Sequence, residues 1–325
     1  MKKQLLIAAI AATMGTAAIA DVSITGNAKY KYTNADVSGT AGSTNSAAGE
    51  VNLIVDGSHG DTKIHVEQEF NMGNTADSAE NIHMEDVWMS TKVGDFGVKI
   101  GAWDGSTTAI TGDIMANSRS ATKVYVTTSV ADVNLGYWTT PADTDVNDGF
   151  TVNTTVSGVK LELKESTNAF TSVRVSGSVA GVALSHENVD SDTAGKDATL
   201  SSASYTTKGI TLKGDVLTGD TSAALGENDG RFIQYDEGMN GVNNGGGDVT
   251  KISQISASMS IAGNTVTLAA AEGVENAGTK NNATKLSVTR ALAGGTNLIA
   301  TYTDAEDDGA TTDTETFTAE LNVKF

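Results

Sequence analysis

Residues 314–325 read T-E-T-F-T-A-E-L-N-V-K-F, and the fold class depends on this stretch. Phe317, Ala319, Leu321, Val323 and Phe325 occupy every second position, and polar side chains stand between them. Successive side chains of a β-strand point to opposite faces, so the stretch predicts a strand with one apolar and one polar face. A soluble sheet buries the apolar face in a core, whereas a barrel in a membrane turns it toward lipid.

The same alternation recurs from Asp21 onward. Within 159–164, for example, apolar residues alternate with Lys160, Glu162 and Lys164. A water-filled interior accepts a face that carries full charges, whereas a dry core does not. Similar stretches are 22–32, 64–70, 255–261, 266–270 and 298–303.

The connections between these stretches alternate in length, which is the pattern of tight periplasmic turns and long outer loops in membrane barrels. The short set is 57–60, 93–95, 130–132, 157–158, 180–181, 208–209, 262–263 and 293–295. The longer set is 33–49, 71–81, 103–120, 141–149, 190–198, 219–249, 273–281 and 305–313, with one further short loop near Asn168. Pairing strands by this rule gives eighteen candidates in one all-β domain, an antiparallel up-and-down barrel.

Composition excludes several classes of protein. The 325 residues contain no cysteine, which excludes disulfide frameworks, thiol nucleophiles and cysteine zinc sites. Beyond the N-terminus no apolar run approaches the roughly twenty residues of a transmembrane helix. The formal net charge of −19 argues against nucleic acid as a partner, because phosphate binding needs clusters of Lys and Arg.

Residues 1–20 are typical of a secretory signal peptide. Lys2 and Lys3 precede the apolar segment 5–12, and Ala18-Ile19-Ala20 is an A-x-A cleavage site. Cleavage would leave the barrel domain 21–325 and, by removing two lysines, change the net charge from −19 to −21. We therefore expect an exported protein.

Residues 94–101 read G-D-F-G-V-K-I-G, a strand, a tight turn and a second strand. This resembles the G-D-F-G hairpin that directly precedes the third outer loop in Gram-negative general porins, and the signal, the paired strands and the terminal Phe fit the same layout. The resemblance implies a water-filled channel in the cell outer membrane of a Gram-negative bacterium. It further implies a homotrimer surrounded by outer-membrane lipid and lipopolysaccharide, with no catalytic residue and no cofactor. Such porins commonly have sixteen strands, so we expect 16–18.

In that family the third loop folds inward and narrows the pore. Here the loop is 103–120, with Asp104, Asp113 and Arg119, and Ala102-Trp103 stands where the family usually has a basic residue. By strand parity the basic side chains on the inner wall are Lys29, Lys31, Lys63, Lys99, Lys123 and Arg174. Opposite charges facing each other across a narrow aqueous gap would give a strong transverse field. The alternative is a set of scattered, solvated charges with no common constriction.

Two stretches have the spacing of metal ligands. His65, Glu67 and Glu69 lie at every second position of one strand, which suits either a metal site or a solvated wall. Residues 304–315 nearly match a calcium-binding loop, although strands and not helices flank them, and we favour the alternative of an acidic outer loop. The calcium candidates are Asp304, Glu306, Asp308 and Glu315.

The sequence thus predicts a channel for passive diffusion of ions and small hydrophilic solutes. The acidic long loops predict a modest preference for cations. One alternative is a secreted or surface-anchored β-rich adhesin, although the variable spacing of the strands does not fit a fixed repeat. Another is an outer-membrane enzyme or substrate-specific channel, in which 219–249 is an insertion; H-E-x-x-H and G-x-S-x-G motifs are absent from the sequence.

Overall fold

The computed structural model describes residues 21–38, 42–72, 81–103, 110, 122–140, 148–192, 197–219, 233, 249–275, 278, 280–307 and 313–325. In these ranges eighteen strands form a single antiparallel sheet in which each strand pairs with the next. The first strand pairs with both the second and the eighteenth, so the sheet closes on itself. The predicted up-and-down barrel is therefore confirmed, with eighteen strands. Among the described residues, no helix is both long enough and apolar enough to cross a membrane.

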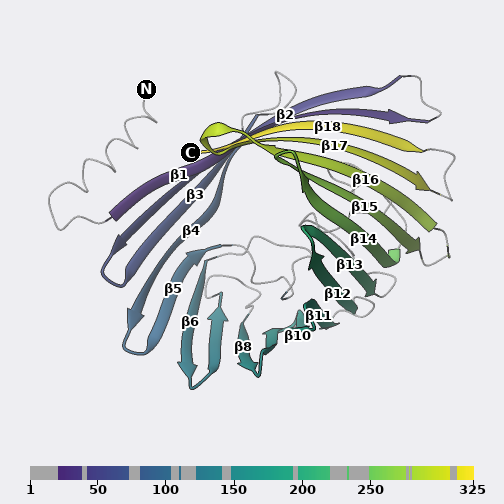
Figure 1. Ribbon diagram of the computed structural model, residues 1–325. Helices are drawn as coiled ribbons and strands as arrows, with labels where there is room; N and C mark the ends of the chain where they lie inside the picture. The colour runs from purple at the N-terminus through teal and green to yellow at the C-terminus, as the bar shows by residue number, and fades with distance from the viewer. Residues whose placement is uncertain are drawn as a thin grey trace, which may run out of the picture.

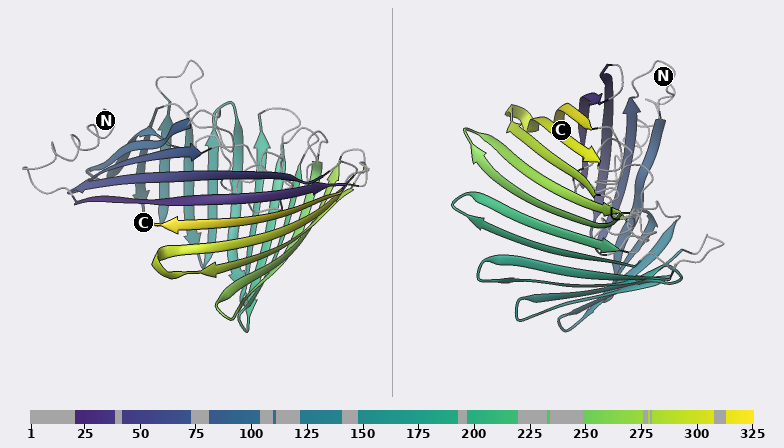
Figure 2. Two further views of the ribbon diagram at one scale, coloured as in Figure 1. Left: turned by 90° about the horizontal axis from the view of Figure 1, so that it is seen from above. Right: turned by 90° about the vertical axis from the view of Figure 1, so that its right-hand side faces the viewer.

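The strands run in order around the barrel, with β1 and β18 side by side (Figure 1). Figure 2 shows the same sheet from two further directions, with the strands strongly tilted. Their bounds are β1 Asp21–Val37, β2 Thr44–His59, β3 Thr62–Met72, β4 Asn81–Val93, β5 Phe96–Ala102, β6 Lys123–Val130, β7 Val133–Thr139, β8 Gly149–Val156 and β9 Val159–Ser166. The remaining strands are β10 Phe170–Val179, β11 Val182–Ser191, β12 Ala198–Thr207, β13 Ile210–Gly219, β14 Val249–Ile261, β15 Asn264–Glu275, β16 Lys280–Ala291, β17 Thr296–Asp307 and β18 Thr314–Lys324.

The short connections owe their geometry to glycine. Ser157-Gly158, Ala180-Gly181, Lys208-Gly209 and Ala262-Gly263 all have positive φ at both residues, between 48° and 81°. Positive φ at both central residues is characteristic of a type I′ turn, whose twist matches that of the flanking strands. Together with the connections 94–95, 131–132 and 292–295, these four turns confirm the predicted short set, except that 57–60 is reduced to 60–61 because β2 continues to His59. Thr167 to Ala169 form the short loop predicted near Asn168.

Most of the longer connections are shorter than predicted, whereas the connection between β5 and β6 runs from 103 to 122 and is slightly longer than the predicted 103–120. The predicted loop 33–49 is reduced to 38–43, because β1 and β2 continue through a segment rich in Thr, Asn and Ser. Cross-strand hydrogen bonds compensate for the weak strand propensity there: the Tyr32 hydroxyl and the Asn34 amide both donate to Asn45 Oδ1, at 2.6 and 2.8 Å.

The terminal residue closes the barrel. The Gly26 N–H donates to the Phe325 carbonyl at 2.9 Å, and the Phe325 N–H donates to the Gly26 carbonyl at 3.1 Å. The Phe325 ring occupies the space into which a Cβ at position 26 would project, so a side chain there would collide with the ring and with the Asn52 backbone. Residues 1–20 lie outside the described part of the chain, and the signal peptide stays a prediction.

The two faces of the barrel have opposite polarity. The exposed large apolar side chains of the described strands all occupy outward positions in the register, as in Ile24, Val179, Ile255 and Leu268, which are 58–68% exposed. The inward positions are mostly polar or charged. This is the reverse of a water-soluble protein, which hides its large apolar patches from solvent.

One part of the inner wall departs from that polarity. Inward positions of β11 to β17 carry buried apolar residues, namely Val189, Ala198, Leu200, Leu217, Ile252, Ala269, Ala271, Ala283 and Ala305. Ile233, from the connection between β13 and β14, is 2% exposed in this cluster, and its N–H donates to Gln254 Oε1 at 2.9 Å. The 219–249 segment therefore contributes at least this residue to the barrel interior.

Candidate functional site

The remaining inner wall is the candidate functional site, because it carries most of the charged groups of the strands. The register places all six predicted basic residues on it, and Lys29 Nζ contacts Glu50 Oε2 of β2 at 2.6 Å. Asp104, Asp113 and Arg119 lie outside the described residues. The field between the two sets stays a prediction.

Aromatic rings and cations alternate along the wall from β3 to β6. The His65 ring stacks on Trp88, with centroids 4.9 Å apart and planes 12° apart. Lys99 Nζ lies 4.2 Å from the centroids of both Trp88 and Trp103, and Lys123 Nζ lies 4.5 Å from that of Trp103. Each ring face thus offers negative electrostatic potential to a neighbouring cation.

The register explains how these groups come together. His65 pairs with Trp88, Trp88 with Gly101, and Gly101 with Lys123, so they form one row across four strands. Gly101 has φ of +143°, and a Cβ there would collide with the Val87 carbonyl oxygen and the Trp88 Cα of β4, so the row requires glycine at this position. Lys123 is fully buried in this row, where the ring of Trp103 partly replaces water around its ammonium.

The third tryptophan belongs to the inner wall as well. Trp138 of β7 is 4% exposed and lies edge to face with Tyr125, at 6.5 Å between centroids. Lys164 Nζ lies 5.7 Å from the Trp138 ring and 5.9 Å from the Phe170 ring. The tryptophans of membrane barrels commonly form girdles at the lipid interface, whereas all three of this chain contact inner-wall groups.

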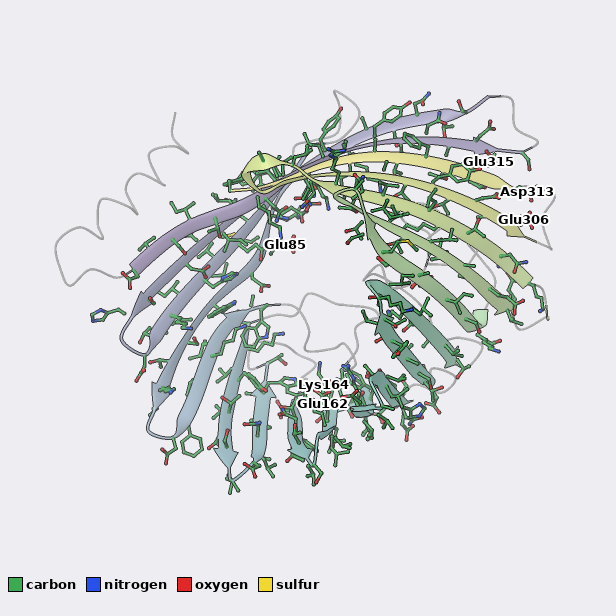
Figure 3. The ribbon with its side chains drawn as sticks, viewed as in Figure 1. Glu85, Glu162, Lys164, Glu306, Asp313 and Glu315 are labelled. Carbon is green, nitrogen blue, oxygen red and sulfur yellow. The ribbon has the colours of Figure 1, made fainter. Side chains whose placement is uncertain are left out.

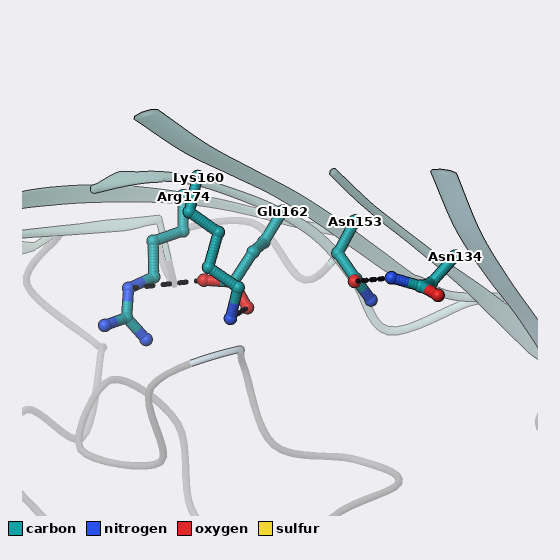
Figure 4. A network of polar contacts seen from close by, with 5 residues as sticks. All are labelled: Asn134, Asn153, Lys160, Glu162 and Arg174. Carbon is teal, nitrogen blue, oxygen red and sulfur yellow. Dashed lines mark hydrogen bonds and ion pairs between the residues drawn. The ribbon is translucent and has the colours of Figure 1, made fainter. Parts of the chain in front are cut away.

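A second group of charges surrounds Glu162 of β9. Its two oxygens contact Lys160 Nζ at 2.6 Å and Arg174 Nε at 3.8 Å. All the side chains in Figure 4 project from the same side of the sheet, and the Asn134 amide donates to Asn153 Oδ1 beside them. Figure 3 shows Glu162 and Lys164 next to each other on this wall. One carboxylate therefore balances two cations here.

Two carboxylates of the inner wall are nearly inaccessible to solvent. Glu187 is 1% exposed and accepts a hydrogen bond from Ser172 at 2.6 Å. Asp215 is 2% exposed, accepts from Ser202 at 2.6 Å and contacts Lys213 Nζ at 2.9 Å. These partners offset the cost of burial. The sequence analysis did not single out either acid, although both have the inward parity of their strands.

The calcium candidates occupy the ends of two paired strands. Asp304 and Glu306 belong to β17 and Glu315 to β18, and Asp304 pairs directly with Glu315. Glu306 and Glu315 lie near Asp313 where the strands meet their connection (Figure 3). Asp308 lies outside the described residues, so calcium binding stays a prediction.

The comparisons with known proteins concern the fold. No protein-family model matches the chain, and no curated protein matches it. Among solved structures the chain is similar to Pseudomonas aeruginosa OpdL, with a TM-score of 0.66, 9% identity, and coverage of 94% of this chain and 99% of that one.

It is also similar to two further proteins of that organism, OccK9 (OpdG), with a TM-score of 0.65 and 14% identity, and OccK2 (OpdF) in complex with glucuronate, with 0.64 and 12%. Each alignment covers 94% of this chain and 98% of the other. The membership in the general porins that the G-D-F-G hairpin suggested is not specifically supported. At identities this low, the similarity shows that the chain shares the barrel fold of these structures and nothing beyond the fold.

Proposed function

We propose that the protein is an outer-membrane channel of a Gram-negative bacterium through which ions and small hydrophilic solutes diffuse passively. The observation that supports this proposal is the inverted polarity of a closed barrel, with apolar side chains exposed outside and charges inside. Lipid and lipopolysaccharide would cover the outer face, and water would fill the charged part of the lumen. A β-solenoid adhesin does not fit, because its strands would stack in a repeat and not close into a barrel.

A second candidate within this class is a substrate-specific channel. The alternating rings and cations from His65 to Lys123, and the buried apolar cluster around Ile233, give the wall a chemistry more particular than scattered charges. Rings suit the apolar face of a solute, and flanking lysines suit a carboxylate on it. OccK2, which has a similar fold, was solved with glucuronate.

The modest cation preference and the homotrimer are further parts of the proposal. Removing the signal would leave a net charge of −21, much of it in long connections, and a negative mouth attracts cations. The lysines of the wall oppose this effect, so the preference should be small. Salt should weaken it further, since the Debye length falls from about 10 Å at 0.1 M to about 3 Å at 1 M salt.

One experiment tests the channel and separates the two candidates. The purified barrel is inserted into planar bilayers, and conductance is recorded with glucose or glucuronate added on one side. A general diffusion channel should respond similarly to both solutes, whereas a specific one should show current block by glucuronate that Lys99→Met with Lys164→Met removes. Absence of stepwise conductance from well-folded protein would refute the channel. A reversal potential showing anion preference at low salt would refute the predicted cation preference.

A further inference from the structure

Three potential metal ligands converge on the inner wall between β3 and β4. His65 and Glu67 come from β3 and Asp86 from β4, and one ligand atom of each lies within 4.8 Å of the other two. All three side chains are half-buried. Sequence spacing suggested Glu69 as the third member of the set; the structure places Asp86 in that position.

A bulge in the β3–β4 pairing brings Asp86 into the group. Val66 pairs with Val87, but Gln68 pairs with Met84, so the single residue Glu67 faces two residues of β4. A regular ladder would keep one parity along β4, and the extra residue changes it. As a result Asp86 shares the inward parity of Trp88, and its carboxylate lies beside Glu67 and His65.

The orientation of His65 is fixed from two sides. Its Nδ1 lies 2.7 Å from Asp56 Oδ1 of β2, and its ring is held flat against Trp88. When Nδ1–H donates to Asp56, the lone pair of Nε2 is available to a metal ion on the side of Glu67. Metal-binding histidines characteristically donate their other ring N–H to a carboxylate in this way, which fixes the tautomer and raises the basicity of the ligand.

The spacing leaves room for an ion between the ligands. His65 Nε2 lies 3.7 Å from Glu67 Oε2, which is longer than a hydrogen bond. Two ligands that each sit about 2.0–2.2 Å from one metal ion are separated by roughly 3–4 Å. A small rotation of the carboxylates would close the set on a single ion.

We infer that His65, Glu67 and Asp86 form a binding site for a divalent transition-metal ion, with Asp56 and Trp88 as positioning residues. One imidazole nitrogen and two carboxylate oxygens suit Zn²⁺ and its neighbours better than Ca²⁺ or Mg²⁺, which prefer all-oxygen sites. Asp86 also interacts electrostatically with Lys99. That ammonium opposes a second cation, so removing its charge should tighten metal binding. The site goes beyond the proposed channel, and its test needs no conduction.

The test uses untagged protein refolded in detergent micelles and titrated with Zn²⁺ by calorimetry. Co²⁺ serves as a second probe, because its visible absorption reports a nitrogen–oxygen coordination sphere. We expect one equivalent to bind. His65→Ala should abolish saturable binding, Asp86→Asn should weaken it at least about tenfold, and Asp56→Asn by about 10- to 100-fold. Lys99→Met should tighten it.

The matched control is His83→Ala, which removes a histidine on the inner wall of the same strand as Asp86, outside the cluster. It should leave the affinity unchanged. Circular dichroism establishes that each variant is folded, and the isosteric Asp86→Asn is informative even where His65→Ala misfolds. The inference is overturned if the wild type shows no saturable binding up to about 1 mM Zn²⁺. Equal affinity in Asp86→Asn or a loss in His83→Ala would also overturn it.

Discussion

Leu286→Arg tests the polarity of the barrel, because the position of Leu286 allows the expected loss of folding free energy to be stated. Leu286 lies midway along β16, is 43% exposed on the outer face, and pairs with Leu268 and Tyr302 on its two neighbours. An arginine facing lipid near the midplane costs about 2–4 kcal/mol. That range corresponds to a folding equilibrium constant lowered by about 30- to 900-fold. Leu286→Ala separates the loss of leucine from the gain of charge.

The matched control is Ser287→Arg, one residue further on the inner face. The Ser287 hydroxyl lies 3.3 Å from Thr301 Oγ1, and losing that hydrogen bond costs about 0.5–1.5 kcal/mol. An arginine there reaches water, so Leu286→Arg should be the more destabilising change. The measurement is urea titration of folding in phospholipid vesicles, followed by tryptophan fluorescence. A penalty at Ser287 equal to or larger than that at Leu286 would refute the assignment of the two faces.

Three further predictions concern charge. Glu162→Gln leaves its two cationic neighbours unbalanced, so the reversal potential under a KCl gradient should move toward anion preference; an unchanged potential would show that this group lies off the ion path. Asp104→Asn and Asp113→Asn should each reduce cation preference, and no change from either would place the 103–120 loop outside the constriction. Micromolar to millimolar Ca²⁺ should protect the β17–β18 connection from protease, and equal protection after Asp304→Ala with Glu315→Ala would leave only a solvated loop.

The fold was predictable because the strands and tight turns of a barrel can be recognised from their own short stretches of sequence. Alternation at a period of two identifies many of the strands, and a serine, alanine or lysine followed by glycine marks four of the two-residue turns. Pairing the strands gave eighteen candidates, but the sequence did not decide between sixteen and eighteen strands. Loop bounds were less accurate, as with 33–49, because cross-strand bonds between polar side chains extend the ladder beyond the alternating segment.

The site was harder to predict, since its decisive contacts depend on register. No spacing along β3 indicates Asp86, which reaches His65 only through the bulge in the β3–β4 pairing. Ile233 lies in a connection rich in Gly and Asn, where the sequence gives no periodic signal. One clue was present: the run Ala269-Ala270-Ala271 breaks the alternation, and apolar side chains on both faces of a strand indicate that protein covers the inner face too.

The pairing of Gly26 with Phe325 has a consequence for assembly. The other strand pairs join neighbours in the chain, and many of them are linked by tight turns, whereas closure joins the two most distant strands. Each doubling of the separation between two paired segments adds about 0.6 kcal/mol of chain entropy to overcome, so hairpins should form early and the seam last. Until then both margins of the sheet expose unpaired amides that would recruit strands of other chains. The ring of Phe325, packed against Gly26, thus stabilises the closed form of the sheet. The longer the sheet stays open, the more time aggregation has to compete with folding.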